Sequence, residues 1–471
     1  MKNLIKNYKT KYFGTDGFRG EVNVDLTSLN AYKVGRFLGW YFTSKLNGEN
    51  ANNYRTKIVV GKDTRRSSYM LEYSLVAGIT ASGADAYLLH VTTTPSVSFI
   101  TKQDGFDAGI MITASHNPYY DNGIKILNRN GEKLDDLTTF YIEQYLDGNL
   151  SVLGVLDSDL PLAKKEKIGF VVDYVSGRNR YLGYLISLAT NSYKNLRIGL
   201  DCANGASFKL AKSVFDALGA KTYVIGEEPN GLNVNEDCGS TNVKNLCELV
   251  KEKRLDLGFA FDGDADRCIA VDEKGNVVDG DKILYVLAMR LKRQNNLNDS
   301  TVVTTIMSNS GLENCLKEKQ ISCVQTKVGD RYVYEKIKES EYSLGGEQSG
   351  HIIIKKYATT GDGILTAIML TEEVCEQKAS LSELAKDVIL YPQFVKNVKV
   401  ISKSAVTSDK TIQNAVNDVK KEFSSGGRIL IRESGTEPVI RIMVECESLV
   451  LAKKYANSIA DLIKERGHCI E

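Results

Sequence analysis

One local pattern recurs three times along the 471-residue chain and constrains its fold more than any other feature. Each copy has an apolar strand, a loop rich in glycine, serine and aspartate, an amphipathic helix and a second strand. The copies are predicted over Lys57–Val91, Leu196–Ile225 and Thr301–Gln325. Strands that alternate with helices of this length indicate βαβ units. We therefore expect an α/β protein with three related α/β domains, whose sheets are mixed and mainly parallel.

The end of the chain follows a different pattern. A helix predicted over Thr411–Lys421 precedes two strands, Arg428–Ile431 and Val439–Val444, and a last helix over about Leu449–Glu465. This order is typical of a compact α+β unit. Tyr391-Pro392 lies before it, and because proline disfavours helix in the preceding residue, we place the last domain boundary there.

Three or four domains are expected because 471 residues exceed what one hydrophobic core usually supports. We predict three α/β domains and a C-terminal α+β domain, over residues 1–160, 161–275, 276–390 and 391–471. In open α/β sheets, ligands bind beyond the carboxyl ends of the strands. The loops that follow the strands are therefore the places where functional side chains should gather.

Composition and charge exclude several classes of protein. With 42% apolar and 25% charged residues, the chain has an ordinary globular composition. Its 60 basic residues nearly balance 59 acidic ones, which argues against a nucleic-acid or membrane-surface partner. The nine cysteines are odd in number and form no CxxC pair, so a disulfide framework or zinc knuckle is not expected. Four histidines are too few for a multi-histidine metal site.

The hydrophobic runs of the chain are short. The first residues lack the apolar segment of a signal peptide. No run approaches the roughly 18 apolar residues that a membrane-spanning helix needs. We therefore expect a cytoplasmic protein in a reducing compartment.

The loop Asp262-Gly263-Asp264-Ala265-Asp266-Arg267 lies between two apolar segments that read as strands. Its three carboxylates alternate along a tight turn and can face one hard cation, because oxygen ligands select Mg²⁺ or Ca²⁺. A calcium-binding EF-hand is disfavoured, because Arg267 stands where the sharp turn needs glycine. The alternative is a solvent-exposed acidic hairpin.

A serine loop follows the apolar segment Gly109–Ile112 and reads Thr113-Ala114-Ser115-His116-Asn117-Pro118. A serine at a strand-to-loop turn is well placed as a nucleophile. His116 and the nearby Lys125 can move its proton or hold a phosphate. The alternative is a turn whose serine and asparagine satisfy backbone groups, and the local residues alone favour it.

Two further loops combine groups suited to a sugar phosphate. Arg432-Glu433-Ser434-Gly435-Thr436-Glu437-Pro438, with Arg441 beyond, has the arginines, hydroxyls and glycine of a phosphate clamp. In the loop Gly345–His351, Glu347 and Ser349 can bind sugar hydroxyls, and His351 can act as an acid or base. An ordinary hairpin and a glycine-rich turn are the respective alternatives.

The four loops, in this order, resemble those of the α-D-phosphohexomutases: TASHNP, DGDADR, GEQSGH and SGTEP. The resemblance begins at FGTDGFRG, residues 13–20, and runs into the last domain. FGTDGFRG, TKVGDR, GEQSGH and TTGDG are most similar to the members that act on glucosamine phosphate. Two residues depart from the family pattern: Phe18 stands where a smaller aliphatic is expected, and Glu433 adds negative charge beside the expected phosphate site.

The resemblance implies four domains around a central cleft, with phosphorylated Ser115 as the active form. It implies Mg²⁺ held by Asp262, Asp264, Asp266 and an oxygen on Ser115. Arg19, Lys125 and Arg267 would surround the moving phosphoryl group with positive charge. The remaining implied site residues are His116, Lys125 and His351 as catalytic groups, Glu347, Ser349 and Lys327 at the sugar, and Arg432, Ser434, Gly435, Thr436 and Arg441 at the phosphate.

The activity implied by the resemblance is interconversion of glucosamine 6-phosphate and glucosamine 1-phosphate. A hexosamine 1,6-bisphosphate would be both intermediate and activator. The alternative is the same reaction on glucose or mannose phosphates, because substrate choice rests on one substituent at C2. A binding protein without turnover and a metal-dependent phosphohydrolase are further alternatives. We expect a small phosphosugar as the only partner, no nucleic acid or membrane, and a monomer or homodimer.

Overall fold

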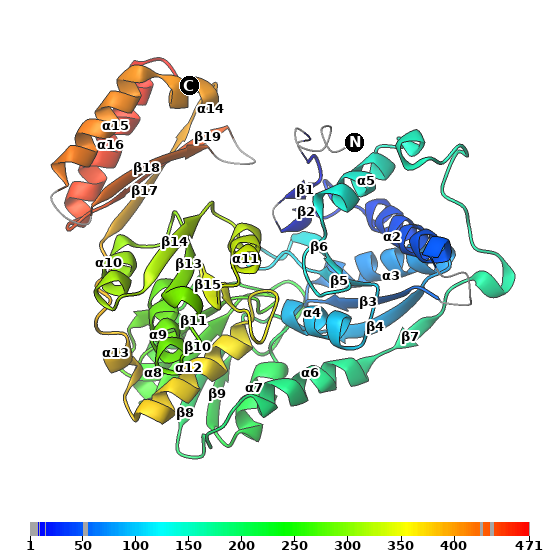
Figure 1. Ribbon diagram of the computed structural model, residues 1–471, viewed down its shortest axis with the longest axis horizontal. Coiled ribbons are helices and arrows are strands. Elements are labelled where there is room, and N and C mark those ends of the chain that lie inside the picture. Colours follow the sequence, from blue (N-terminus) through cyan, green and yellow to red (C-terminus); the bar gives the residue numbers. More distant parts are fainter. Residues whose placement is uncertain are drawn as a thin grey trace. The chain divides into compact units, whose positions relative to one another are not determined.

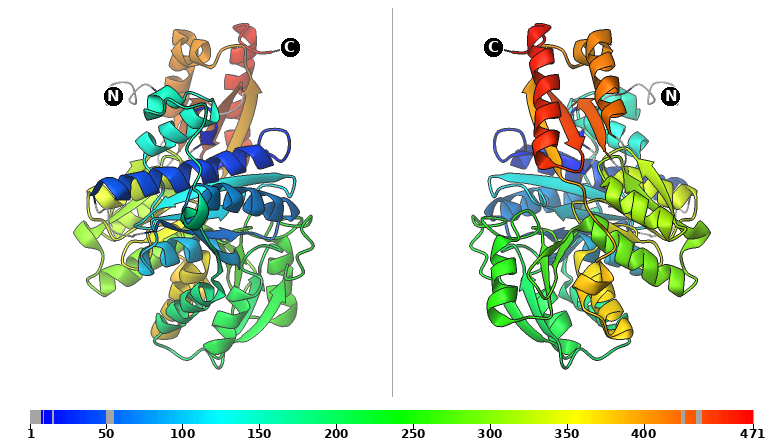
Figure 2. Two further views of the ribbon diagram at one scale, coloured as in Figure 1. Left: turned by 90° about the vertical axis from the view of Figure 1, so that its right-hand side faces the viewer. Right: turned by 90° about the vertical axis from the view of Figure 1, so that its left-hand side faces the viewer.

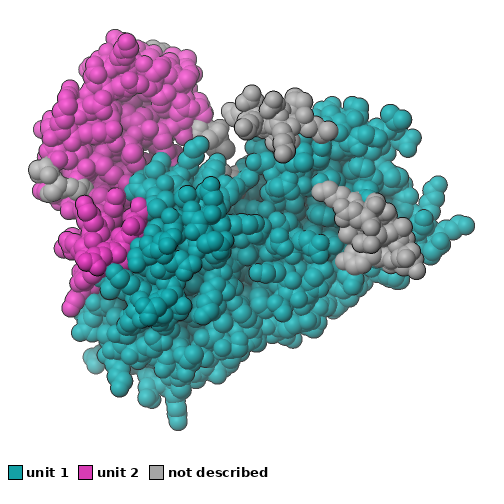
Figure 3. Space-filling view, in the orientation of Figure 1, with its two compact units in different colours: residues 1–307, 324–385 teal, residues 308–323, 386–471 magenta. Residues whose placement is uncertain are grey.

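The computed structural model describes residues 8, 10–14, 16–49, 55–423, 427–433 and 438–470. The chain forms two compact units, and each is described by itself (Figure 3). The first comprises residues 1–307 and 324–385, and the second comprises residues 308–323 and 386–471. No helix among the described residues is long and apolar enough to span a bilayer.

The first sheet has seven strands in the order β1-β2-β6-β5-β3-β4-β7 (Figure 1). Strands β5, β3, β4 and β7 are parallel to one another, whereas β1, β2 and β6 are added antiparallel at one edge. The bounds are β1 Phe13–Gly14, β2 Gly17–Glu21, β3 Lys57–Lys62, β4 Asp85–Val91, β5 Ala108–Ile112, β6 Asp121–Asn128 and β7 Val171–Asp173.

Apolar residues on both faces of this sheet explain why its central strands are buried. Ile58 and Val60 of β3 belong to the core under the helices α2 and α3, whereas Val59 belongs to the core under α4. Figures 1 and 2 show these helices on opposite faces of the sheet. The helices are α2 Ser28–Glu49, α3 Arg66–Ala81, α4 Thr94–Gln103 and α5 Asp136–Leu146.

The second sheet has the strand order β12-β11-β10-β8-β9. The central strand β10 is parallel to β8 and antiparallel to β11, so the chain turns back directly after β10. That turn is the predicted metal loop. The bounds are α6 Val175–Ser187, β8 Arg197–Asp201, α7 Leu210–Ala217, β9 Lys221–Ile225, α8 Lys244–Lys253, β10 Leu257–Phe261, β11 Cys268–Val271 and β12 Val277–Val278.

The third sheet has the strand order β14-β13-β15-β16. Strand β15 is parallel to β13 and antiparallel to β16, so the β15–β16 turn holds the predicted sugar loop. The bounds are α9 Gly280–Arg293, β13 Thr301–Thr305, α10 Ser310–Glu318, β14 Ser322–Thr326, α11 Asp330–Glu339, β15 Leu344–Gly346, β16 Ile352–Ile354, α12 Gly363–Gln377 and α13 Leu381–Leu384. Short 3-10 turns at Leu150–Leu153, Lys165–Lys167 and Asn298–Ser300 lie between the sheets' elements.

The second unit contains an antiparallel sheet in the order β17-β19-β18, with α15 and α16 packed on its apolar face (Figure 1). Strand β17 was not predicted, because its sequence QFVKNVK carries only a weak apolar alternation. The bounds are β17 Gln393–Lys399, α14 Lys403–Ser408, α15 Lys410–Glu422, β18 Arg428–Glu433, β19 Val439–Glu445 and α16 Leu449–Glu465.

The architecture confirms the predicted fold class: α/β domains with mixed sheets, followed by an α+β domain. All three copies of the strand–loop–helix–strand pattern are present, as β3-α3-β4, β8-α7-β9 and β13-α10-β14. Strand β7 lies beyond the boundary predicted at residue 160, yet it joins the first sheet through β4. Its three residues are too few to show a strand pattern in the sequence. The four domain ranges stay a prediction.

Candidate active site

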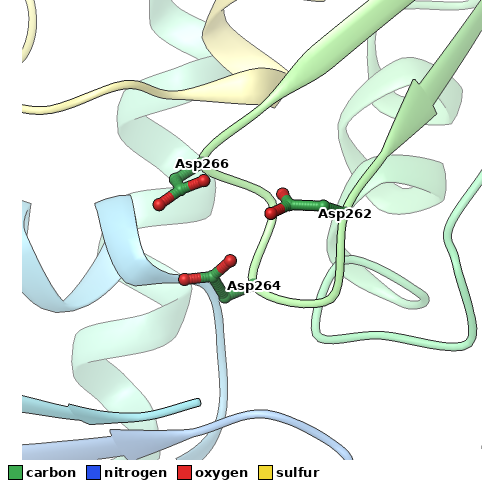
Figure 4. Close-up of side chains that lie close together, drawn as sticks. All are labelled: Asp262, Asp264 and Asp266. Atoms are coloured by element: carbon green, nitrogen blue, oxygen red, sulfur yellow. The ribbon is translucent and has the colours of Figure 1, made fainter. Parts of the chain in front are cut away.

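Three aspartates of the β10–β11 turn face one another (Figure 4). Asp262, Asp264 and Asp266 are buried, and one carboxylate oxygen from each lies within 4.8 Å of the others. Ala265 has a φ of 55°, which tightens the turn between two of them. Buried oxygen ligands grouped this closely fit a hard divalent cation.

The electrostatics of this triad also fit a cation. Burial, together with Asp266 and Asp264, raises the pKa of Asp262 well above its usual value. Burial opposes ionisation of Asp266, but Lys125 and His351 together outweigh burial and hold the pKa of Asp266 well below its usual value. Among the described residues, Oδ1 of Asp264 and Oδ1 of Asp266 have no hydrogen-bond donor. A divalent cation would satisfy these buried oxygens and offset the clustered charge.

The serine loop lies directly against the metal loop, although the two are far apart in the sequence. Ser115 Oγ donates a hydrogen bond of 2.5 Å to Asp262 Oδ2, across 147 positions of the chain. His116 Nδ1 lies 3.3 Å from the same oxygen of Ser115. The approach needs glycine at position 263, because a Cβ there would lie 2.5 Å from the Ser115 carbonyl oxygen. The nucleophile candidate and the metal ligands therefore form one site.

Lys125 of β6 joins the two loops to a fourth carboxylate. Its Nζ lies 2.7 Å from Asp264 Oδ2, 2.8 Å from Asp266 Oδ2 and 3.0 Å from Asp16 Oδ2. Burial opposes the charge, but the three carboxylates outweigh burial and raise the pKa of Lys125 well above its usual value. Lys125 is therefore a cation here, and it can accept a proton only when these carboxylates have another positive partner.

Two arginines add donors beside the carboxylates. Arg19 of β2 pairs with Asp16, and the Arg267 backbone N–H donates to Asp262 Oδ1 at 3.2 Å. The Nε atoms of both arginines are buried and have no acceptor among the described residues. Buried guanidinium donors without an acceptor are suited to a phosphate that enters the site.

The two histidines are in opposite electrostatic environments. Burial, Arg267 and Arg19 lower the pKa of His116 to about 3, so its ring is neutral. Burial disfavours charge on His351 as well, but Asp266 and Asp330 outweigh it and raise the pKa of His351 to about 9.

One hydrogen bond opposes a doubly protonated His351. The Gly361 N–H donates to its Nε2 at 3.0 Å, which requires a lone pair on that nitrogen. Nδ1 lies 3.6 Å from Asp266 Oδ1, so the single proton of a neutral ring would point at this aspartate. We favour the neutral form when a divalent cation occupies the aspartates, because the cation removes the charge that raises the pKa.

The predicted sugar loop lies in the β15–β16 turn. Glu347 Oε1 accepts a hydrogen bond from the Gly329 N–H at 3.0 Å, which orients the carboxylate. Ser349 Oγ is buried without a partner among the described residues. Lys327 is exposed, and its ammonium lies 5.9 Å from the centroid of the Tyr332 ring rather than on a carboxylate of the site.

The predicted phosphate clamp lies in the second unit. Arg432 of β18 and Arg441 of β19 are directly opposite each other in the sheet. Ser434, Gly435 and Thr436 lie outside the described residues.

Four residues of the site were missed in the sequence analysis. Asp16 bridges Arg19, Lys125 and Lys133, and Lys133 in turn lies 2.5 Å from Asp330 Oδ2. Burial raises the pKa of Asp16, but Lys125 and Lys133 outweigh it and hold the pKa well below its usual value. Thr94, at the start of α4, donates from Oγ1 to Asp264 Oδ2 at 2.5 Å.

Only part of this set could have been found from sequence. Asp16 lies within FGTDGFRG and Asp330 within TKVGDR, two segments that already pointed to function. Lys133 and Thr94 lie in segments without a functional pattern. Their roles depend on the strand order of the first sheet.

The chain matches four phosphoglucomutase/phosphomannomutase domain families. The matches are alpha/beta/alpha domain I over residues 10–151, domain II over 173–275, domain III over 279–391 and the C-terminal domain over 396–462.

A phosphoglucosamine mutase of Lachnospira eligens is 55% identical over 460 residues, 98% of this chain and 100% of that protein. A phosphoglucosamine mutase of Bacillus subtilis is 45% identical over 454 residues, 96% of this chain and 98% of that protein.

Solved structures share the fold at low sequence identity. A phosphoglucomutase/phosphomannomutase family protein of Burkholderia thailandensis has a TM-score of 0.76 at 22% identity, with 97% of this chain and 98% of that chain covered. The Aspergillus fumigatus N-acetylphosphoglucosamine mutase, solved with GlcNAc-6P and magnesium, has a TM-score of 0.69 at 17% identity, with 98% of each chain covered.

Fold, site and relatives together define a phosphohexomutase, an enzyme of the isomerase class. The chain belongs to the phosphoglucomutase/phosphomannomutase family, the α-D-phosphohexomutases. Within that family its sequence is similar to the phosphoglucosamine mutases.

Proposed function

We propose that the protein interconverts glucosamine 6-phosphate and glucosamine 1-phosphate by phosphoryl transfer through Ser115. The observation that carries the proposal is the contact of Ser115 Oγ with the aspartate triad. A nucleophilic oxygen beside three buried carboxylates is what metal-assisted phosphoryl transfer needs. Phosphoglucosamine mutase relatives at 45–55% identity support the amino sugar as substrate.

Asp262, Asp264 and Asp266 would hold Mg²⁺, which would supply positive charge against the phosphoryl oxygens in a loose transition state. Arg19, Lys125 and Arg267 add further positive charge on the protein side. The Nε donors of Arg19 and Arg267 have no acceptor among the described residues, and the Lys125 ammonium contacts Asp264. These donors are in place before substrate binds, so little reorganisation is needed during the reaction.

In the first half-reaction, the free hydroxyl of the bound sugar phosphate attacks the phosphorus on phosphorylated Ser115. A new sugar O–P bond forms as the serine Oγ–P bond breaks. The hydroxyl proton passes to the Lys125 amine, which is free to accept it once a cation offsets the carboxylates that hold the Lys125 proton. His351 is the second candidate, and it can accept the proton on Nε2 only after the Gly361 N–H releases that nitrogen. The product is the hexosamine 1,6-bisphosphate. The bisphosphate then reverses its orientation in the site. Its other phosphate is transferred to Ser115 by the reverse steps, so the enzyme is phosphorylated again.

The contacts to the substrate are assigned to the two loops whose residue types suit a sugar phosphate. Glu347 and Ser349 would bind the sugar hydroxyls, since the Ser349 hydroxyl has no partner among the described residues. Lys327, exposed beside this loop, is a further substrate contact. Arg432 and Arg441, with Ser434, Gly435 and Thr436, would bind the phosphate that is not being transferred.

The substrate is tested by a coupled assay with glucosamine 6-phosphate, glucose 1-phosphate and mannose 1-phosphate in parallel. We expect kcat/KM to be at least tenfold higher for the glucosamine phosphate, because about 1.4 kcal/mol of discrimination at C2 gives that ratio. A tenfold preference for glucose or mannose phosphate would instead support the alternative substrates. Inorganic phosphate is measured in the same samples, since its stoichiometric release would identify a phosphohydrolase.

A further inference from the structure

A fully buried arginine lies under the loop that carries Ser115. Arg65 follows β3 and immediately precedes α3. A guanidinium has five N–H donors in one plane, and the acceptors around Arg65 match all five. Its Nε donates to Asp63 Oδ2 at 2.8 Å. The other four donors reach backbone carbonyl oxygens of the serine loop and of the first residue of β6: Ser115 at 2.9 Å, Asn117 at 2.8 Å, Asp121 at 3.0 Å, and Pro118.

The backbone of Ser115 needs such support because its conformation is unfavourable. Its φ is 53°, in the left-handed region that non-glycine residues rarely adopt. The Ser115 N–H donates to Thr113 Oγ1 at 2.9 Å, and Thr113 Oγ1 donates to Asp63 Oδ2 at 2.7 Å. The Asp63–Arg65 pair thus restrains the Ser115 N–H through Thr113 and the Ser115 carbonyl directly.

A second side chain, that of Asn235, donates to two of the same carbonyl oxygens. Asn235, between β9 and α8, donates from Nδ2 to the Ser115 oxygen at 2.9 Å and to the Asn117 oxygen at 3.1 Å. Ser115 and Asn117 therefore each accept from both Arg65 and Asn235. Two side chains from other parts of the chain, Arg65 and Asn235, therefore restrain the backbone of the serine loop.

We propose that Arg65 is a positioning residue for phosphoryl transfer, which keeps the Ser115 backbone in the conformation that directs Oγ at the aspartate triad. The proposal rests on the proposed function of Ser115. Arg65 touches no reacting atom and acts only through the loop carbonyls. A lysine cannot replace it, because an ammonium has three donors and no fixed plane with which to reach Asp63 and four carbonyls together.

Arg36 of α2 offers a matched control for substitution of Arg65. It is also fully buried, and it donates to Ser82 Oγ at 2.8 Å and to the carbonyl oxygens of Leu160 and Pro161. None of these partners belongs to the serine loop or to the aspartate triad. Arg36→Lys therefore reports the cost of disturbing a buried arginine without disturbing Ser115.

The test compares Arg65→Lys with Arg36→Lys and wild type. We expect kcat of Arg65→Lys to fall about 100-fold, because a misplacement of about 1 Å in a reacting group costs that much. KM for the sugar phosphate and the Mg²⁺ concentration for half-maximal activity should stay within about threefold of wild type, since those contacts are intact. Arg36→Lys should lower Tm as much or more but keep the wild-type kcat.

Two further measurements separate positioning from a general loss of structure. Hydrogen exchange should be faster in residues 114–121 of Arg65→Lys and unchanged around the β10–β11 turn. Asn235→Ala removes donors from the same carbonyls at a partly exposed site, so it tests the idea even if Arg65→Lys does not fold. We expect it to lower kcat about tenfold with little change in KM.

The outcomes are distinguishable. An inactive wild type would refute the proposed function itself. An active wild type, with Arg65→Lys or Asn235→Ala as active as Arg36→Lys, would leave that function intact and overturn the positioning role. A parallel change in KM, Mg²⁺ dependence and kcat would also overturn it, because such a pattern indicates general distortion of the site.

Discussion

Ser115→Ala is expected to reduce mutase turnover at least about 1,000-fold, because it removes the only atom that receives and returns the phosphoryl group in the proposed cycle. The fold should be kept, since the variant loses one hydroxyl and its hydrogen bonds to Asp262 and His116. Turnover is measured with glucosamine 6-phosphate and bisphosphate activator. Intact mass should show a species one phosphate heavier in wild type and none in the variant.

Ser82→Ala is the matched control for this variant. Ser82 is also buried in the first sheet's helical layer, and its Oγ is hydrogen-bonded to Arg36. The control should lose a similar amount of stability and keep both turnover and the phosphorylated species. Wild-type activity in Ser115→Ala, or the heavier species persisting in it, would contradict the phosphoserine mechanism.

Asp264→Asn is expected to lower turnover by roughly 100-fold or more, because even indirect partners of metal ligands contribute 10–100-fold. The change removes one charge from the triad and also weakens the contact with Lys125 Nζ at 2.7 Å. Turnover is measured over a Mg²⁺ titration, in which high concentrations should restore activity only in part. A chelator should inhibit wild type, and added Mg²⁺ should reverse the inhibition.

Thermal unfolding gives a readout of this site that does not depend on turnover. Mg²⁺ should raise Tm of wild type, because a ligand that binds only the native state stabilises it, and the rise should shrink in Asp264→Asn. Asp272→Asn is the control: Asp272 is buried beyond β11, where it accepts hydrogen bonds from the turn at Lys274 and Asn276. Equal Mg²⁺ responses in wild type and Asp264→Asn would contradict the metal assignment.

The chemical groups of the site could be read from the sequence because each loop is a local feature. Three carboxylates at alternate positions after an apolar segment indicate a cation site whatever the rest of the fold. The serine after β5 and the Glu347 loop were less specific, because an ordinary turn explains each of them locally, and their assignment came from the order of the four loops. The recurring βαβ pattern likewise predicted the α/β class, which the mixed sheets confirm.

Other features of the fold and the site were not indicated by any local sequence pattern. Strand β7 was missed because its three residues, two of them exposed, show no periodicity, and it pairs with β4 residues that lie 85 positions earlier in the chain. Lys133 was missed because nothing beside it indicates that its ammonium meets Asp16 and Asp330. Pairing between such distant residues is set by strand order and register, which a single sequence does not state.

The sequence by itself determined which side chains can do chemistry here: a serine, three aspartates and several cations, at spacings that local backbone geometry explains. Only the tertiary structure decided that Ser115 meets Asp262 and that Lys125 meets Asp264, contacts that span 147 and 139 positions. It also decided that Arg65 supports the serine loop. The physical reason is that a hydrogen bond or ion pair acts over about 3–4 Å, so its partners are chosen by how the sheets pack and not by their order in the chain.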